Sequence, residues 1–154
     1  GLFIERRQPQ LAQALLEESL RRNPYQSGVL ASLGSVYCGN GETLRGLDAY
    51  RRAIELDPDN PPIRLSLASV YVVNKELDQA CHQLQQVLRL APEHVPALIA
   101  MARVHLLRQE KPQAIECVRR VLQLRPDDLY AQGLLSELGE RLDSDAPRPN
   151  DIER

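Results

Sequence analysis

The chain has 154 residues, of which 43% are hydrophobic and 26% are charged, a balance typical of a single folded domain. Its formal net charge of -2 lacks the basic footprint of a nucleic-acid-binding protein or of a polybasic segment at a membrane surface. No apolar run approaches the roughly 20 residues that a membrane span needs. We therefore expect no nucleic-acid partner and no direct membrane insertion.

Four prolines recur at one spacing along the chain. Pro24, Pro58, Pro92 and Pro126 each follow the previous one by 34 residues, and the segments before them match in register, as in LEESLRRNP and YRRAIELDP. A fixed period of this length indicates a stack of supersecondary units in place of one globular core. Within each period, apolar residues recur every three and four residues in two successive runs, which predicts a hairpin of two amphipathic helices.

The register divides the chain into units. Residues 1–26 are interpreted as a partial repeat whose first helix is mostly missing, and we expect its second helix to begin at Pro9, because proline is tolerated in the first turn. Three complete repeats are expected to follow, at 27–60, 61–94 and 95–128.

The end of the chain departs from the complete repeats. A lone helix at about 129–142 is expected to cap the stack, since terminal units of solenoids need a different outer face. Asn60 and Asp128 are predicted to cap the helices that follow them. The polar, proline-broken segment 143–154 is expected to be a disordered tail.

Small side chains recur at the two positions where the helices of a pair should cross. In the first helix this position holds Gly34, Ala68, Ala102 and Ser136. In the second helix it holds Ala12, Gly46, Ala80 and Ala114. Small residues let two helix backbones approach closely, so these positions predict tight crossings within each pair. A bulky apolar residue follows the second small position by four residues, at Leu16, Tyr50, Leu84 and Val118.

This pattern resembles the tetratricopeptide repeat (TPR) family, and the resemblance covers nearly the whole chain. It implies an all-α fold, a right-handed superhelical solenoid of antiparallel helix pairs, in which a groove carries the function. One departure concerns a tyrosine late in the first helix, which is Tyr37 and Tyr71 in two copies and His105 in the third. We predict that His105 packs as the tyrosine would, in preference to binding a ligand.

The resemblance also implies that the first helix of each repeat lines a concave face on which partners bind. The expected partner-binding groove comprises Ala31, Ser35, Cys38, Leu65, Ser69, Val72, Val73, Ile99, Arg103, Leu106 and Leu107. These residues are mostly small and aliphatic, which suits an apolar helix or an extended segment of another protein. The alternative is that Leu65, Ile99 and Leu106 only pack against neighbouring helices.

Some TPR proteins, such as heat-shock cochaperones, hold an acidic peptide terminus in a clamp of lysine, arginine and asparagine. The corresponding positions in this chain hold Gly28, Ser32, Ser66, Pro96 and Ala100. The clamp is therefore absent, and we predict that the protein does not recognise the carboxyl terminus of a heat-shock chaperone.

The sequence predicts no catalytic residue, no cofactor and no metal site. His82, His94 and His105 are isolated, and the three cysteines have neither disulfide nor metal-ligand spacing. No nucleophile with a partnered base and no glycine-rich phosphate loop stands out.

The leading hypothesis is a non-enzymatic adaptor that grips a peptide or helix within a larger assembly. A second is a self-assembling scaffold, because the incomplete first repeat exposes a helix face that another copy could cover. A third is the regulatory segment of a larger enzyme. The 17 arginines against two lysines hint at a bacterial source. A bacterial source would favour a role in envelope assembly, secretion or polysaccharide export. The protein would then be located in the cytoplasm or in the periplasm.

Overall fold

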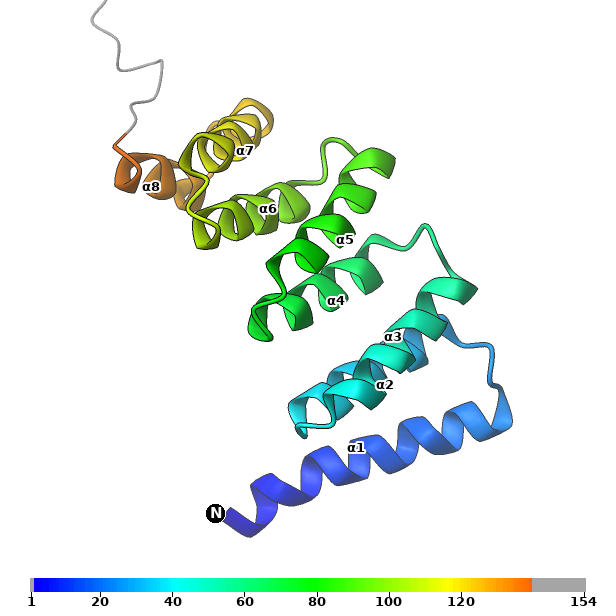
Figure 1. The fold of residues 1–154 in the computed structure, drawn as a ribbon. Helices are drawn as coiled ribbons and strands as arrows, with labels where there is room; N and C mark the ends of the chain where they lie inside the picture. The colour runs from blue at the N-terminus through cyan, green and yellow to red at the C-terminus, as the bar shows by residue number, and fades with distance from the viewer. Residues whose placement is uncertain (1, 140–154) are drawn as a thin grey trace, which may run out of the picture. The chain divides into compact units, whose positions relative to one another are not determined.

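The computed structural model describes the backbone of residues 2–139 and the side chains of residues 10–139. The predicted tail at 143–154 lies outside these residues. The described part of the chain forms eight helices, namely α1 (Leu2–Arg22), α2 (Ser27–Gly39), α3 (Thr43–Leu56), α4 (Pro61–Val73), α5 (Leu77–Leu90), α6 (Val95–Leu107), α7 (Lys111–Leu124) and α8 (Leu129–Glu137) (Figure 1). They belong to two compact units, Gly1–Leu90 and Ala91–Arg154.

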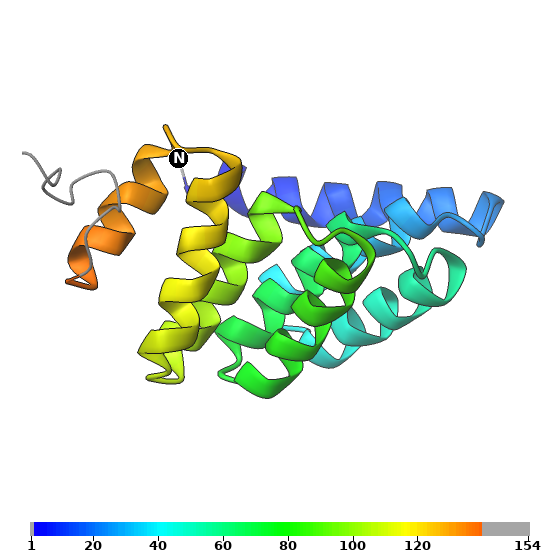
Figure 2. The ribbon, with the colours of Figure 1, turned by 90° about the horizontal axis from the view of Figure 1, so that it is seen from above.

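Each unit is built from antiparallel helix pairs. In the first unit α2 pairs with α3 and α4 pairs with α5, while α1 packs on α2; in the second unit α6 pairs with α7, which contacts α8 (Figures 1 and 2). Helices α2, α4, α6 and α8 begin at residues 27, 61, 95 and 129, which preserves the 34-residue period. The prediction of an all-α fold made of paired helices is confirmed.

Side chains cap the helices where the sequence placed caps. The side-chain oxygen of Asn60 accepts a hydrogen bond from the backbone N–H three residues later at 3.4 Å, and that of Asp128 does so at 2.9 Å. His94 holds the equivalent position before α6, and its Nδ1 accepts from the backbone N–H of Ala97 at 3.2 Å. These bonds satisfy amide groups that have no partner within the first turn.

The first and last helices differ from their predicted limits. Helix α1 begins at Leu2 and runs through Pro9, where the sequence predicted a helix start, so that prediction is wrong. Proline has no N–H to donate, which favours the first turn of a helix but does not prevent a helix from continuing on both sides. Helix α8 ends at Glu137, before residue 142, and Gly139 follows with a left-handed φ of 74°.

The turn inside each complete hairpin is the same Schellman motif. After α2, the N–H of Gly41 donates to the Cys38 carbonyl at 3.1 Å and the next N–H donates to the Tyr37 carbonyl at 2.8 Å. The same two bonds recur after α4 and α6. The motif needs a left-handed residue, and its φ values are 85° at Gly41, 63° at Lys75 and 62° at Gln109. Only the first of these three positions holds the residue type that adopts this conformation without strain.

We expect Lys75→Gly and Gln109→Gly each to raise the free energy of unfolding by about 0.5 to 1 kcal/mol. Relief of the left-handed strain, about 1 to 2 kcal/mol, exceeds the added entropy of the unfolded chain. Urea denaturation followed by circular dichroism measures the change. The matched control, Gly41→Ala, should lower stability, and a loss of stability in both glycine variants would contradict the strain argument.

A polar cluster joins α1 to the first complete pair. The Tyr37 hydroxyl donates to Glu17 on α1 at 2.8 Å and accepts from the Arg45 guanidinium on α3 at 2.8 Å. The guanidinium also lies over the Tyr37 ring, 4.0 Å from its centroid. Hydrogen bonds from Gln13 and Tyr37 lower the pKa of Glu17, so its carboxylate is ionised at neutral pH and α1 is held by a charge-assisted contact.

Candidate functional site

The site begins at the close crossing of α2 and α3. A Cβ added to Gly46 would collide with the sulfur of Cys38 and would lie 2.9 Å from the Gly34 carbonyl oxygen. A Cβ added to Gly34 would lie 2.9 Å from the Tyr50 ring. The predicted glycine positions therefore do bring these two helices together, and the missing side chains leave room for the Tyr50 ring to lie against α2.

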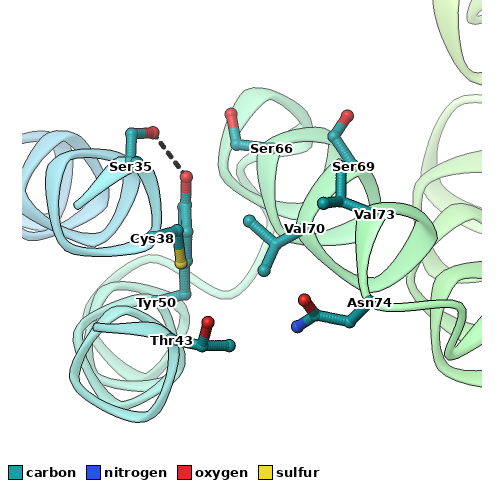
Figure 3. A pocket seen from close by; sticks show the side chains of 10 residues that line it. Ser35, Cys38, Thr43, Tyr50, Ser66, Ser69, Val70, Val73 and Asn74 are labelled. Atoms are coloured by element: carbon teal, nitrogen blue, oxygen red, sulfur yellow. Dashed lines mark hydrogen bonds between the residues drawn. The ribbon is translucent and has the colours of Figure 1, made fainter. Parts of the chain in front are cut away.

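A hollow of about 410 Å³ opens beside this crossing, between the α2–α3 pair and α4. Figure 3 shows Cys38 and Tyr50 on one side and Val70 facing them from the other. Its lining residues are Ser35, Cys38, Gly39, Thr43, Tyr50, Ser66, Ser69, Val70, Val73 and Asn74. The apolar atoms are contributed mainly by Val70, Val73, Cys38 and the tyrosine ring, whereas hydroxyl and amide groups surround them.

A second hollow of about 350 Å³ continues the first toward the start of α2 and α4, and the two share Ser35 and Ser66. It is lined by Gly28, Ala31, Ser32, Ser35, Asn60, Pro62, Ile63 and Ser66. We call the two hollows together the α2–α4 groove. None of its lining residues is Asp, Glu, Lys, Arg or His, although 26% of the chain is charged.

The titratable side chains that line the groove, Cys38 and Tyr50, are also uncharged at neutral pH. Burial raises the pKa of the Cys38 thiol and that of the Tyr50 hydroxyl, so both groups are neutral. The Tyr50 and Ser35 hydroxyl oxygens lie 2.5 Å apart and share a hydrogen bond (Figure 3). The protonated thiol is the weakly nucleophilic form of cysteine.

Two serines of the groove use their protons within their own helices. Ser32 Oγ donates to the Gly28 carbonyl at 2.9 Å, and Ser69 Oγ donates to the Leu65 carbonyl at 3.1 Å. Their free lone pairs leave them as hydrogen-bond acceptors on the groove surface. The groove can therefore take apolar side chains and accept hydrogen bonds from N–H groups, a combination that suits a polypeptide.

The predicted groove residues divide among three helices. Ala31, Ser35 and Cys38 on α2, together with Ser69 and Val73 on α4, line the α2–α4 groove. Leu65 and Val72, also on α4, are half-buried and line neither hollow.

The remaining predicted residues lie on α6 in the second unit. Ile99 and Leu106 are half-buried, while Arg103 and Leu107 are exposed. None of the eleven predicted residues is fully buried. The half-burial of Leu65, Ile99 and Leu106 fits packing against neighbouring helices as well as contact with a partner. Whether these residues bind a partner remains a prediction.

Several groove residues were missed from the sequence. Thr43 and Tyr50 come from α3, the second helix of a pair, whereas the resemblance directed attention to first helices only. Val70 on α4 and Asn74, the residue that follows α4, line the same hollow. The signal for Tyr50 is its size, since it is the largest residue at the bulky position next to the crossing.

His105 makes a polar contact beyond the packing role that the sequence predicted. It is half-buried on α6, and its Nδ1 lies 2.6 Å from Oε2 of Glu110. This hydrogen bond is the main cause that lowers the pKa of Glu110. Among residues 10–139, whose side chains the structure describes, no group of three or more His, Cys, Asp or Glu side chains is arranged to hold a metal ion.

None of the helices in residues 2–139 is both long and apolar enough to cross a membrane.

Solved structures share this fold. YrrB, a TPR protein with an unusual peptide-binding site, is 19% identical, with a TM-score of 0.72 over 87% of this chain and 69% of its own. PilF of Pseudomonas aeruginosa is 20% identical, with a TM-score of 0.76 over 88% and 62%. The first TPR domain of Spaghetti (RPAP3), solved with the HSP90 peptide SRMEEVD, is 24% identical, with a TM-score of 0.65 over 73% and 90%. At these identities the likeness establishes the fold alone.

No curated protein sequence matches this chain significantly. A family profile does match, however, and it spans residues 5–131, from α1 into α8. That profile describes the TPR domain of the cytochrome c-type biogenesis protein H. Because the match covers most of the chain, and because the helices repeat in TPR register, this chain belongs to the family of cytochrome c-type biogenesis protein H TPR domains.

Proposed function

We propose that this domain binds a polypeptide segment in the α2–α4 groove and thereby holds a partner protein during the biogenesis of c-type cytochromes. The uncharged lining of the groove is the observation that carries the proposal. Family membership supports the process, and the geometry supports the class of ligand. The domain acts by binding and leaves the chemistry to its partners.

The groove favours a neutral, partly apolar segment over an acidic one. Val70 and Val73 offer a surface against which an aliphatic or aromatic side chain can lose contact with water, which stabilises binding by about 25 cal/mol for each Å² buried. The acceptor oxygens of Ser32 and Ser69 can pair with backbone N–H groups. A carboxylate finds no cation in the lining, so its desolvation would be uncompensated.

The uncharged groove also distinguishes this domain from TPR proteins that bind an acidic peptide terminus. Gly28, Ser32 and Ser66 occupy three of the positions where a clamp would need charged or amide side chains, and all three line the groove. We therefore propose an internal or apolar segment of a cytochrome biogenesis partner, with unfolded apocytochrome c as the first probe.

We expect Val73→Glu to weaken binding of apocytochrome c by at least tenfold, because it places a charge at a groove position that is 80% exposed in the free protein. Fluorescence or calorimetric titration measures the dissociation constant. Leu44→Glu is the matched control, since Leu44 is 85% exposed at the start of α3 and lies outside the groove. Its affinity should equal that of the unmodified protein.

The peptide SRMEEVD should not bind measurably to this protein in the same titration. Equal loss of apocytochrome affinity in Val73→Glu and Leu44→Glu would place the binding surface elsewhere. Tight binding of the acidic peptide would contradict the argument from the uncharged lining.

A further inference from the structure

Hydroxyl groups divide the α2–α4 groove into two parts. Ser35 on α2 and Ser66 on α4 are the two residues that both hollows share, so they lie where one hollow meets the other. The hydroxyl of Tyr50 on α3 lies between them, 2.5 Å from the Ser35 oxygen (Figure 3). Burial raises the pKa of this hydroxyl, whereas the hydroxyls of Ser35 and Ser66 lower it. We call these three side chains the hydroxyl cluster.

The serines of the groove recur in the register of the repeats. Ser32 and Ser35 on α2 are followed 34 residues later by Ser66 and Ser69 on α4. The equivalent positions of α6 hold an alanine and an arginine. Among the three complete repeats, the two rows of hydroxyl groups are therefore confined to the helices that form this groove.

The spacing of the two hollows limits the ligand that can fill both. On α2, Cys38 lines the first hollow, and Ala31, seven residues earlier, lines the second. On α4, Val70 and Ile63 have the same relation. Seven residues of an α-helix rise about 10 Å. A bound segment that fills both hollows must therefore present two side chains on one face, about 10 Å apart.

Two regular conformations meet this requirement and one does not. In a β-strand, side chains on one face are about 7 Å or about 13 Å apart, so no pair matches. A polyproline II segment has three residues per turn and puts residues i and i+3 on one face, about 9 Å apart. An α-helix puts residues i and i+7 on one face, about 10 Å apart. Spacing alone therefore allows a polyproline II segment or a helix.

The hydroxyl cluster distinguishes between these two conformations. A helix forms its backbone hydrogen bonds internally, so it would remove water from Ser35 and Ser66 without offering them a partner. A polyproline II segment has no internal hydrogen bonds, so its N–H and C=O groups are free to pair with hydroxyl groups. The bond between Ser35 and Tyr50 uses only one of the cluster's protons. The cluster can therefore donate to a bound backbone as well as accept from it.

We propose that the groove binds a polyproline II segment, with apolar side chains at positions i and i+3 in the two hollows and the intervening backbone on the hydroxyl cluster. This inference rests on the proposed peptide binding and specifies which kind of segment is bound. The first hollow takes the larger side chain, because it has about 410 Å³ of space and the second has about 350 Å³.

The test titrates three neutral, capped and fluorescently labelled peptides with the whole chain. The matching probe carries Leu-Pro-Gln-Leu between Gly-Ser flanks, because the proline favours the polyproline II region for the leucine before it. The second probe carries Leu-Pro-Gln-Gln-Leu, which moves the leucines to i and i+4. The third is a stapled Ala/Gln helix with leucines at i and i+7. The matching probe should bind roughly tenfold more tightly than either of the others, because it alone fills both hollows and pairs with the cluster.

Two variants test the cluster and the second hollow. Ser35→Ala should weaken binding of the matching probe about fivefold and leave that of the stapled helix unchanged, because only an open backbone pairs with this hydroxyl. Gly28→Glu should weaken binding of the matching probe roughly tenfold, because it puts a charge beside the second hollow. It should have little effect on a peptide with a single leucine, which occupies the first hollow.

Both variants should fold, because Ser35 is exposed and a Cβ added to Gly28 meets nothing within 4 Å. Circular dichroism verifies their helix content. Ser136→Ala is the matched control, since Ser136 is exposed on α8 and lies outside the groove. It should bind the matching probe as the unmodified protein does.

Three results would overturn the inference. Equal affinity for the three probes, or tightest binding of the stapled helix, would contradict the extended conformation and leave the proposed peptide binding in place. An equal loss in Ser35→Ala for the matching probe and the helix would mean that Ser35 shapes the groove without pairing with a backbone. If neither the probes nor apocytochrome c bind, the proposed function is wrong and this inference is wrong with it.

Discussion

Replacing Gly46 with alanine is expected to lower the free energy of unfolding by about 1 to 3 kcal/mol. The added methyl group would overlap the sulfur of Cys38 and press on the Gly34 carbonyl oxygen, 2.9 Å away. A backbone oxygen cannot move aside as the end of a flexible side chain can, so α2 and α3 must separate. Urea denaturation followed by circular dichroism measures the loss.

The control for this substitution lies on the same pair of helices. Gly28→Ala, near the start of α2, should instead raise stability by about 0.5 to 1 kcal/mol, because alanine is the better helix former and its Cβ meets nothing within 4 Å. The opposite signs distinguish packing from propensity. If Gly46→Ala were as stable as the unmodified protein, the crossing would be looser than described.

Loss of this crossing should also change the groove. Cys38 and Tyr50 line the hollow from the two helices that Gly46 holds together. A shift of Cys38 away from a new methyl group would carry it into the space beside Val70. We therefore link the close helix approach to the shape of the binding surface as well as to stability.

Much of the fold could be predicted because its signals are local. The period of the prolines set the helix starts, and Asn60 and Asp128 marked caps through a bond to a backbone N–H only three residues away. Small residues at Gly34 and Gly46 indicated a close crossing, because no other residue type permits it there. These features depend on residue type and spacing alone.

Other features depend on tertiary context. Lys75 and Gln109 adopt left-handed backbone conformations because the hairpin turn requires them. Their residue types do not predict this conformation, whereas the glycine at the equivalent position 41 does. The contribution of Tyr50 to the groove was missed, because it depends on how α3 lies against α2 and α4. Pro9 misplaced the start of α1, since proline permits a helix start without requiring one.

Truncation of the fully buried Leu84 in α5 is expected to have the largest effect. Leu84→Ala should lower the free energy of unfolding by about 2 to 5 kcal/mol, because it removes three buried carbon atoms and leaves a cavity that neighbouring helices cannot fill. Denaturant unfolding gives the value, and an unchanged m-value would show that the same structure unfolds.

Leu16→Ala is the matched comparison, because Leu16 holds the equivalent position in α1. It packs on Leu33 and Tyr37 of the first complete pair but is half-exposed, so its truncation should cost less than half as much in the monomer. A Leu16→Ala loss as large as that of Leu84→Ala in dilute solution would mean that this face of α1 is already covered.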